Sequence, residues 1–154
     1  MDQIELKEPH RKYAADIWRF RQEIFECDAE HEDRFAGCLS LDVSRSAEEW
    51  IEICKLRKKE ETCGETGTEV PAHMYLAVRR RDDRIVGAID LRHHIEHPIL
   101  GTWGGHCGYS VRPSERGKGY AKEMLRLNIQ NAKALEITRF RACPQTVIQY
   151  LLIR

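Results

Sequence analysis

What this sequence lacks already excludes several classes of protein. Its 25 basic residues balance its 25 acidic ones, so the basic excess typical of nucleic-acid and anionic-membrane binding is missing, and we expect neither partner. We find no apolar run of eighteen residues and no secretory leader, so no membrane segment is expected. The six cysteines show no C-x-x-C spacing, which disfavours a zinc ribbon; with no secretory start, a reduced cytoplasmic location is the expectation.

The 154 residues, 42% of them hydrophobic and 32% charged, predict one domain over 1–154 with a substantial core. Alternating apolar residues indicate strands, and apolar residues at helical spacing indicate helices. We expect strands at 3–7, 74–78, 84–91, 103–111 and 137–143, and helices at 13–25, 47–54 and 119–136. This order predicts a mixed α/β fold with a mostly antiparallel sheet and flanking helices.

The most informative segment is 111–121, where an apolar strand turns into an amphipathic helix. Gly117 and Gly119 let the backbone approach an anion closely, and the first amides of the helix point outward with the positive end of its dipole. Five basic residues against two acidic ones between Arg112 and Arg126 add charge of the same sign. The segment therefore predicts a phosphate-binding turn, the alternative being an ordinary turn with a capping glycine.

Two familiar phosphate motifs do not fit this turn. A Walker-type loop requires Ser or Thr directly after Gly-Lys, yet Lys118 is followed by Gly119. A dinucleotide-binding fingerprint requires a third glycine, and Lys122 occupies that position. Neither nucleoside triphosphate nor dinucleotide binding is predicted.

Arg116, Gly119 and Ala121 fill the pattern Arg/Gln-x-x-Gly-x-Gly/Ala, and the pattern follows Val111-x-Pro113. The segment resembles the acyl-coenzyme A loop of the GNAT superfamily of N-acetyltransferases. The resemblance implies a V-shaped sheet, acetyl-coenzyme A as cosubstrate, and direct attack by a primary amine, which we expect to be a small molecule. It also implies an acceptor pocket among the helices and loops between Tyr13 and Glu61.

The resemblance further implies roles for individual residues. The pantetheine arm would pair along Tyr109 to Val111, and a backbone amide near the end of the 103–111 strand would stabilise the developing oxyanion. Main-chain amides would hold the diphosphate, and these belong to Arg116, Gly117, Lys118, Gly119, Tyr120 and Ala121. Two of these residues, Arg116 and Lys118, would add side-chain charge.

The resemblance does not identify a general base, because many relatives use a Glu on the strand at 103–111 and here there is none. His106 is the best substitute, since its ordinary pKa suits proton transfer near neutrality and neighbouring glycines leave room for a substrate. Asp90, on the preceding strand, is a second candidate for relaying the proton or binding the amine. The alternatives are a hydrogen-bonded structural role for His106 and a solvent-facing strand position for Asp90. Tyr109 and Tyr120 are candidates for protonating the thiolate, but the sequence does not assign the acid.

Residues 93–97 match the H-x-x-E-H pattern of inverted zinc peptidases. That chemistry needs a helix to bring the terminal histidines together, and Pro98 disfavours helical geometry at His97. A solvated loop beside the acceptor pocket is the preferred interpretation, and no metal is expected.

The last eleven residues depart from the family pattern, because they show neither the expected helix nor its glycine-rich exit. Two explanations stay open: a chain truncated or read out of frame from about Phe140, or a short member whose Val147 to Ile153 complete the sheet. An incomplete sheet exposes a strand edge and apolar surface, so we expect a homodimer or larger assembly. The alternative function is a catalytically defective module that binds coenzyme A or only oligomerises.

Overall fold

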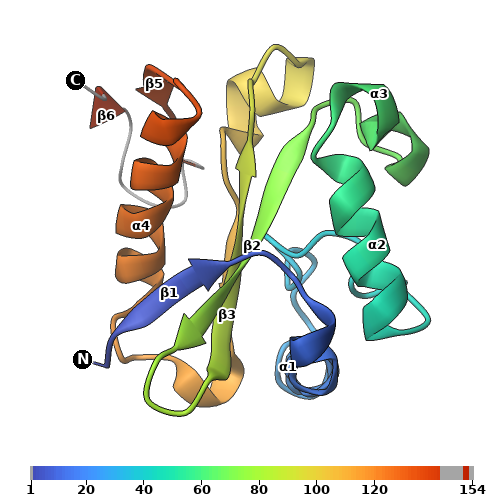
Figure 1. Cartoon of the computed structure of the whole chain (residues 1–154), viewed down its shortest axis with the longest axis vertical. Helices are drawn as coiled ribbons and strands as arrows, with labels where there is room; N and C mark the ends of the chain where they lie inside the picture. The colour runs from blue at the N-terminus through green and yellow to red at the C-terminus, as the bar shows by residue number, and fades with distance from the viewer. Residues whose placement is uncertain (1, 143–150, 153–154) are drawn as a thin grey trace.

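Four antiparallel strands form the central sheet of the computed structural model, which describes residues 2–142 and 151–152 (Figure 1). Their order across the sheet follows the sequence: β1 (Ile4–Lys7), β2 (Ala72–Arg79), β3 (Arg84–Arg92) and β4 (Tyr109–Val111). Each strand pairs antiparallel with its neighbour. The predicted mixed α/β class with a mostly antiparallel sheet is therefore confirmed.

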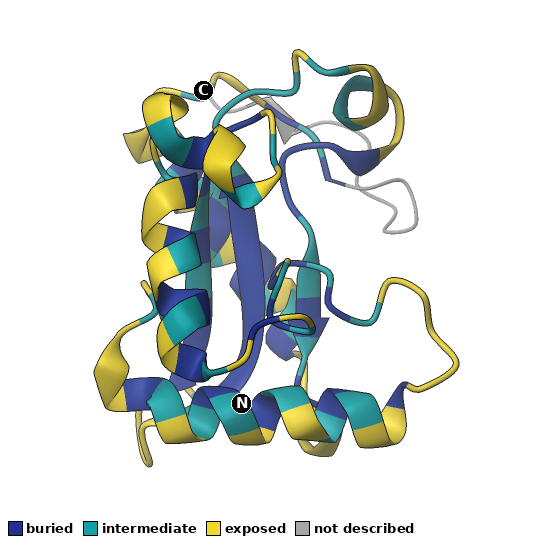
Figure 2. Cartoon of the chain, turned by 90° about the vertical axis from the view of Figure 1, so that its right-hand side faces the viewer, coloured by how far each residue is buried: buried dark blue, intermediate teal, exposed yellow. Residues whose placement is uncertain are grey.

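Helices cover both faces of this sheet (Figure 1). Helices α1 (Ala14–Cys27) and α2 (Ala47–Arg57) pack against one face, and α4 (Tyr120–Ala134) packs against the other. Figure 2 shows the buried residues of α2 turned toward the strands and its exposed residues turned outward, as helical apolar spacing requires. Shorter helical turns connect these elements: η1 (Arg11–Tyr13), α3 (Glu60–Cys63), η2 (Gly64–Thr66), η3 (Leu100–Gly104) and η4 (Pro113–Glu115).

The capping signal before α2 is also present in the structure. The Ser46 side chain accepts a hydrogen bond from the Glu49 amide at 3.1 Å, which satisfies one of the unpaired donors at the start of the helix. The Glu49 carboxylate accepts from the Arg45 amide at 2.6 Å. In a standard capping box this carboxylate accepts from the amide of the N-cap residue, here Ser46, so the bond in this protein lies one residue earlier.

One predicted strand is confirmed only toward its C-terminal end. Residues 103–111 were expected to be extended, but Leu100–Gly104 form a π-helical turn and only Tyr109–Val111 form a strand. The Arg92 guanidinium donates to the carbonyls of Gly104 and Gly105 at 3.1 and 3.0 Å, and Gly105 has a positive φ of 64°. These interactions hold the chain in a turn that its local sequence pattern does not indicate.

The segment after α4 returns beside β4. Strand β5 (Arg139–Phe140) pairs antiparallel with β6 (Leu151–Leu152), while Cys107 and Ala142 form a parallel bridge. The predicted strand at 137–143 is thus confirmed in part. Residues 143–150 and 153–154 lie outside the described residues, as do most of the positions on which the two explanations for the tail depend. In the described part of the chain, no helix is long and apolar enough to cross a bilayer.

Candidate active site

The turn predicted to hold phosphate has free backbone donors. Gly117 and Gly119 adopt positive φ angles of 76° and 86°, and α4 begins directly after them. Among the residues that the structure describes, the backbone N–H groups of residues 117–122 have no hydrogen-bond acceptor. The positive end of the helix dipole lies behind them, so the turn presents a row of donors suited to an anion.

The side chains around this turn differ from the sequence expectation, because most of its basic residues are already paired. Arg116 binds both carboxylate oxygens of Asp28, one of them at 2.8 Å, and this pairing lowers the pKa of Asp28. The ammonium of Lys118 lies 2.7 Å from Glu115. Two further arginines are paired: Arg112 with both Asp16 and Glu23, and Arg126 with Glu123. The local excess of positive charge is therefore offset by carboxylates, most of which come from distant parts of the sequence.

A cavity of about 740 Å³ opens at this turn, and we call it the cofactor cavity. Its walls are β4, the turn from Glu115 to Ala121 apart from Lys118, and Asp28 with residues 30–34 of the connector between α1 and α2. The Gly108 carbonyl accepts from the Asp90 amide and the Arg112 amide donates to the Val86 carbonyl, both on β3. Because peptide groups alternate along a strand, those of Tyr109 and Val111 face the opposite edge, toward the side where an extended ligand could pair. The Val111 carbonyl on that edge accepts from Arg116 Nε at 3.2 Å.

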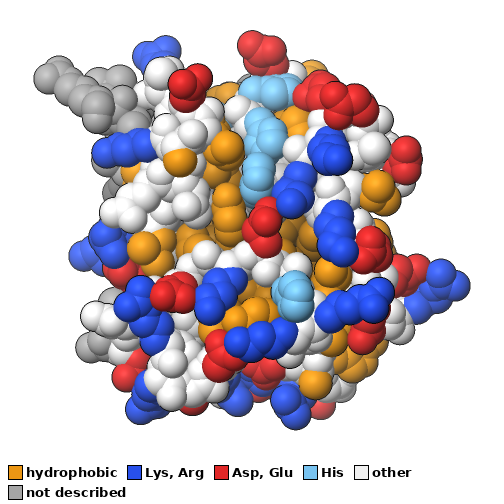
Figure 3. Space-filling view, viewed as in Figure 1, with side chains coloured by type: hydrophobic (Ala, Val, Ile, Leu, Met, Phe, Trp, Pro, Cys, Tyr) orange, Lys and Arg blue, Asp and Glu red, His pale blue; other side chains and the backbone are white. Residues whose placement is uncertain are grey.

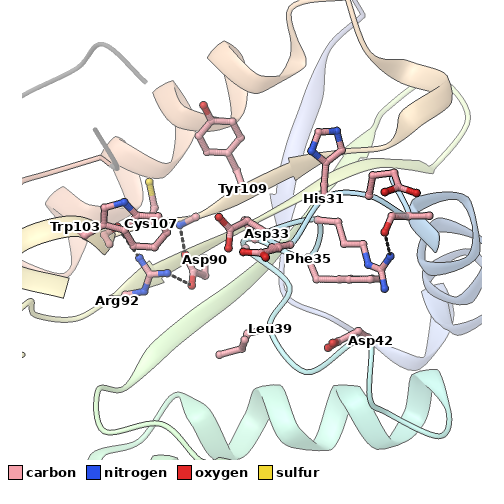
Figure 4. A pocket seen from close by; sticks show the side chains of 18 residues that line it. His31, Asp33, Phe35, Leu39, Asp42, Asp90, Arg92, Trp103, Cys107 and Tyr109 are labelled. Atoms are coloured by element: carbon pink, nitrogen blue, oxygen red, sulfur yellow. Dashed lines mark hydrogen bonds and ion pairs between the residues drawn. The ribbon is translucent and has the colours of Figure 1, made fainter. Parts of the chain in front are cut away.

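A second cavity, of about 830 Å³, lies beside the first, and we call it the acceptor cavity (Figure 4). It is bounded by the connector, by the end of β3, and by the segment from Trp103 to Tyr109. Tyr109 and connector residues 30–34 line both cavities. The two cavities therefore share one wall and form neighbouring compartments of one cleft.

Asp90 lies at the base of the acceptor cavity. Its Oδ1 accepts from the Gly108 amide at 2.6 Å and its Oδ2 is 3.4 Å from Arg92 Nη2, as Figure 4 shows. The residue is only 5% exposed, and this burial raises the pKa of the Asp90 carboxyl. A carboxylate whose pKa is raised toward neutrality is suited to accept a proton.

Asn128 on α4 contributes to this arrangement and was not identified from the sequence. Its Nδ2 donates to the backbone carbonyl of Asp90 at 2.8 Å, and the residue is completely buried. Since that carbonyl is bound by Asn128, the Gly108 amide donates to the Asp90 side chain. The signal available in the sequence was an Asn on the apolar face of the helix predicted at 119–136.

His106 lies elsewhere. It is 6% exposed, its ring stacks on Phe140 at 5.6 Å between centroids, and its Nδ1 accepts from the Arg141 amide at 3.0 Å. Burial lowers the pKa of His106. Its side chain lines neither the cofactor nor the acceptor cavity. Of the two candidate bases, the structure brings Asp90 into the cleft and leaves His106 bonded to the backbone.

The two candidate acids, Tyr109 and Tyr120, lie in different environments. The Tyr120 hydroxyl lies 3.3 Å from Arg79 Nη1 and 3.5 Å from Asp2, and the residue is buried at the start of α4. Tyr109 is partly exposed and lines both cavities. Tyr109 is therefore the tyrosine whose side chain is available to a ligand.

The histidines of the 93–97 motif contact different partners. His93 Nε2 lies 2.7 Å from His73 Nδ1, whereas His97 Nε2 lies 3.1 Å from Glu69. Burial lowers the pKa of His93 to about 4. Figure 3 shows histidine side chains arranged in a column on the face of the molecule that is turned to the viewer in Figure 1. Within the described residues, no group of three or more His, Cys, Asp or Glu side chains is arranged to hold a metal.

The connector supplies the site residues that sequence reasoning missed. It lies within the stretch from Tyr13 to Glu61 where an acceptor pocket was expected, although none of its residues was named. Phe35, Cys38 and Leu41 are buried in the core, and its first part walls both cavities. The dense charged run from Asp28 to Arg34 was the available signal. Ser110 anchors the connector by donating to the Ala36 carbonyl at 2.6 Å.

Comparison with known proteins agrees with this geometry. Residues 6–146 match the family described as acetyltransferase (GNAT) domain. No curated protein and no solved structure matches the chain. Because the family match covers most of the sequence, the chain belongs to the GNAT acetyltransferase family.

Proposed function

We propose that this acetyltransferase transfers an acetyl group from acetyl-coenzyme A to a primary amine of a small molecule, by direct attack in a ternary complex. One observation carries the proposal. A row of unpaired amides opens onto a cavity that adjoins the compartment of the buried Asp90 carboxyl. The reaction requires a site that binds the anionic coenzyme and, in the same cleft, a group that accepts a proton from the amine.

The residues present fit the coenzyme. Backbone amides of residues 117–122 are free to bind the diphosphate, and Gly117 has open space where a side chain would otherwise stand. The outward peptide groups of Tyr109 and Val111 are placed to pair with the amides of the pantetheine arm. When bound, acetyl-coenzyme A supplies an activated acyl group with a thiol leaving group.

Asp90 is the proposed general base. A primary amine has an ordinary pKa near that of lysine, about 10.4, so near neutrality it arrives protonated and cannot attack. Asp90 takes the proton from the ammonium, and the neutral nitrogen then forms its bond to the acetyl carbon. The burial that raises the pKa of Asp90 brings the base closer to the pH at which it must work.

Two further groups complete the proposed chemistry. The Tyr109 amide faces the open edge of β4 and donates to the carbonyl oxygen as negative charge develops on it. The carbon–sulfur bond then breaks, and the sulfur needs a proton. The Tyr109 hydroxyl is the proposed acid, because Tyr109 lines both compartments whereas the Tyr120 hydroxyl is bonded to Arg79.

Cytoplasmic location and self-association remain part of the proposal, supported by the sequence alone. Light scattering tests the second of these. A single monomeric species across a wide concentration range would refute the predicted homodimer or larger assembly.

The direct test is calorimetry with acetyl-coenzyme A, followed by measurement of thiol release with a panel of primary amines. We expect binding and amine-dependent release. Arg116→Glu reverses charge at the cofactor cavity and should weaken binding of acetyl-coenzyme A. Arg126→Glu is the matched control, because it reverses a paired charge on the exposed side of α4.

Two results would contradict parts of this proposal. Binding without thiol release for every amine would leave only a coenzyme-binding module. Equal dissociation constants for wild type and Arg116→Glu would show that the diphosphate does not lie at this turn.

A further inference from the structure

The acceptor cavity has an uneven charge. Five carboxylates line it, against two guanidinium groups. In the part of the chain that the structure describes, four of the five have no ion-pair partner, namely Glu30, Glu32, Asp33 and Asp42. The fifth is Asp90, which is buried at the base of the cavity.

The two guanidinium groups are held by the protein itself. Arg34 lies 4.8 Å above the Phe25 ring and donates to the Ala29 carbonyl at 3.1 Å. Arg92 is bound by the carbonyls of Gly104 and Gly105 and lies beside Asp90. The two guanidinium groups are thus bound by protein partners, whereas the unpaired carboxylates stay available to bind a cation. A concave surface concentrates the negative potential that results.

The same cavity also exposes two large apolar side chains. Trp103 is 47% exposed and Leu39 is 52% exposed, and both line the cavity. Figure 4 shows Asp33 and Asp42 on the connector side of the cavity, with Trp103 and Arg92 on the other. An aliphatic chain can pack on Trp103 and Leu39, and an ammonium group is also attracted to an indole face.

We propose that the acceptor is a small aliphatic diamine or polyamine, with one amino group at Asp90 and a second ammonium bound by the connector carboxylates, chiefly Asp33 and Asp42. This inference rests on the proposed function. It follows from three features that meet in one cavity: a buried carboxyl next to the acyl compartment, unpaired carboxylates at the rim, and an apolar surface between them.

The chemistry balances with the protein's own groups. The reacting ammonium gives one proton to Asp90, and the neutral nitrogen bonds to the acetyl carbon. As the carbon–sulfur bond breaks, the sulfur takes the Tyr109 hydroxyl proton, and the second proton lost by the nitrogen restores that hydroxyl. The product is a monoacetylated amine that keeps its second ammonium but carries one positive charge fewer than the substrate. Weaker attraction to the carboxylates then favours product release.

Three amines of equal chain length test the inference: 1,4-diaminobutane, butylamine and 4-aminobutanoate. Each carries a primary amine at one end of a four-carbon chain, and the other end carries an ammonium, a methyl group or a carboxylate. The two equivalent amines of the diamine contribute only a factor of two to kcat/KM. We expect kcat/KM to fall in that order, with about tenfold between the diamine and butylamine, the value of one charge-assisted hydrogen bond. Added salt should reduce kcat/KM for the diamine and leave butylamine nearly unaffected.

The variant Asp33→Asn/Asp42→Asn removes two rim charges without changing side-chain volume. It should raise KM for 1,4-diaminobutane about tenfold or more and leave kcat and the KM for butylamine unchanged. Glu65→Gln is the matched control, because Glu65 is an exposed acidic residue outside both cavities. Its KM values should equal those of the wild type.

The outcomes separate this inference from the proposed function. Equal or higher kcat/KM for butylamine, or for a peptide amine, would overturn the diamine assignment while transfer itself stands. If no amine releases thiol, transfer fails, and calorimetry with 1,4-diaminobutane still decides the charge inference. Binding that weakens in Asp33→Asn/Asp42→Asn supports it, and no binding to the wild type overturns it.

Discussion

Replacing Asp90 with Asn separates its proposed chemical role from its structural one. Asparagine keeps the size of the side chain and an oxygen that accepts from the Gly108 amide, now at 2.6 Å from Asp90 Oδ1, but it cannot take a proton. General-base catalysis contributes about 10²- to 10⁴-fold to a rate. We therefore expect kcat for Asp90→Asn to fall by that factor while the dissociation constant for acetyl-coenzyme A stays unchanged.

Stability should respond quite differently. Burial raises the pKa of Asp90, so the folded state binds its proton more tightly than the unfolded chain, whose pKa is about 3.9. The contribution of this group to stability is therefore lost as pH rises from that value through the raised folded pKa. At neutral pH the wild type bears the cost of a buried charge, which Asp90→Asn removes. The loss of a charge-assisted bond, and of a counter-charge for Arg92, works against that gain.

The net change in unfolding free energy for Asp90→Asn should thus stay within about 1 kcal/mol. Asp90→Ala is the contrasting variant, because it removes the acceptor of the half-buried Gly108 amide, at a cost of about 1 kcal/mol or more. Both variants should lose activity equally, and only the alanine should lose stability in urea unfolding.

Single-turnover acetyl transfer, measured from pH 5 to 9 with saturating amine, is the appropriate assay. The wild-type rate should rise with pH as Asp90 ionises, and this limb should be absent in Asp90→Asn. A folded Asp90→Asn protein with wild-type kcat and an unchanged pH profile would refute the assignment of Asp90 as base.

Three other substitutions test the framework around the site. Gly37→Ala should cost about 1–3 kcal/mol, because Gly37 has φ of 79° and an added Cβ would lie 2.5 Å from the Gly108 carbonyl; an unchanged urea midpoint would contradict this. Trp50→Ala, at a completely buried position, should cost about 3–5 kcal/mol in the same measurement, and a much smaller loss would mean that the core refills the space. His106→Ala should remove the acceptor of the Arg141 amide and cost about 1–3 kcal/mol without reducing kcat in the assay above; reduced kcat at full stability would restore His106 as a candidate base.

The elements that could be predicted from sequence are those with strong local periodicity. Helices α1 and α4 bury one apolar face each, and β2 and β3 are long enough to show their pattern. The start of α4 was also predictable, because Gly117 and Gly119 mark a turn whose backbone needs positive φ. In these segments the residues that decide the structure lie within a few positions of one another.

Other features depend on partners distant in sequence. Counting charges near the turn suggested a basic surface, but Arg112 is neutralised by Asp16 and Glu23, and Arg116 by Asp28. These pairs join residues 88 to 96 positions apart. Local composition carries no information about which carboxylate will pack beside a given arginine.

The same limitation explains the reversal between the two candidate bases. Glycines around His106 suggested an open strand facing the substrate, but the positive φ of Gly105 turns the chain there and directs the imidazole to Arg141. Asp90 was given a solvent-facing alternative, yet the connector covers its side of β3. Its environment is set by Gly108 and Asn128, both distant in sequence.

The connector between α1 and α2 links the two compartments physically, since its residues 30–34 line both of them. It is fixed at three points: Asp28 binds Arg116, Ser110 donates to Ala36, and Gly37 packs against Gly108. One of these anchors lies on β4 and a second directly precedes it; the outward edge of β4 is proposed to hold the pantetheine arm. The third is the turn that is proposed to hold the diphosphate. A ligand that orders this edge therefore also orders the wall carrying the acceptor carboxylates. Because folded interiors transmit small displacements through packed contacts rather than absorbing them, binding of the coenzyme should shape the acceptor cavity before the amine arrives.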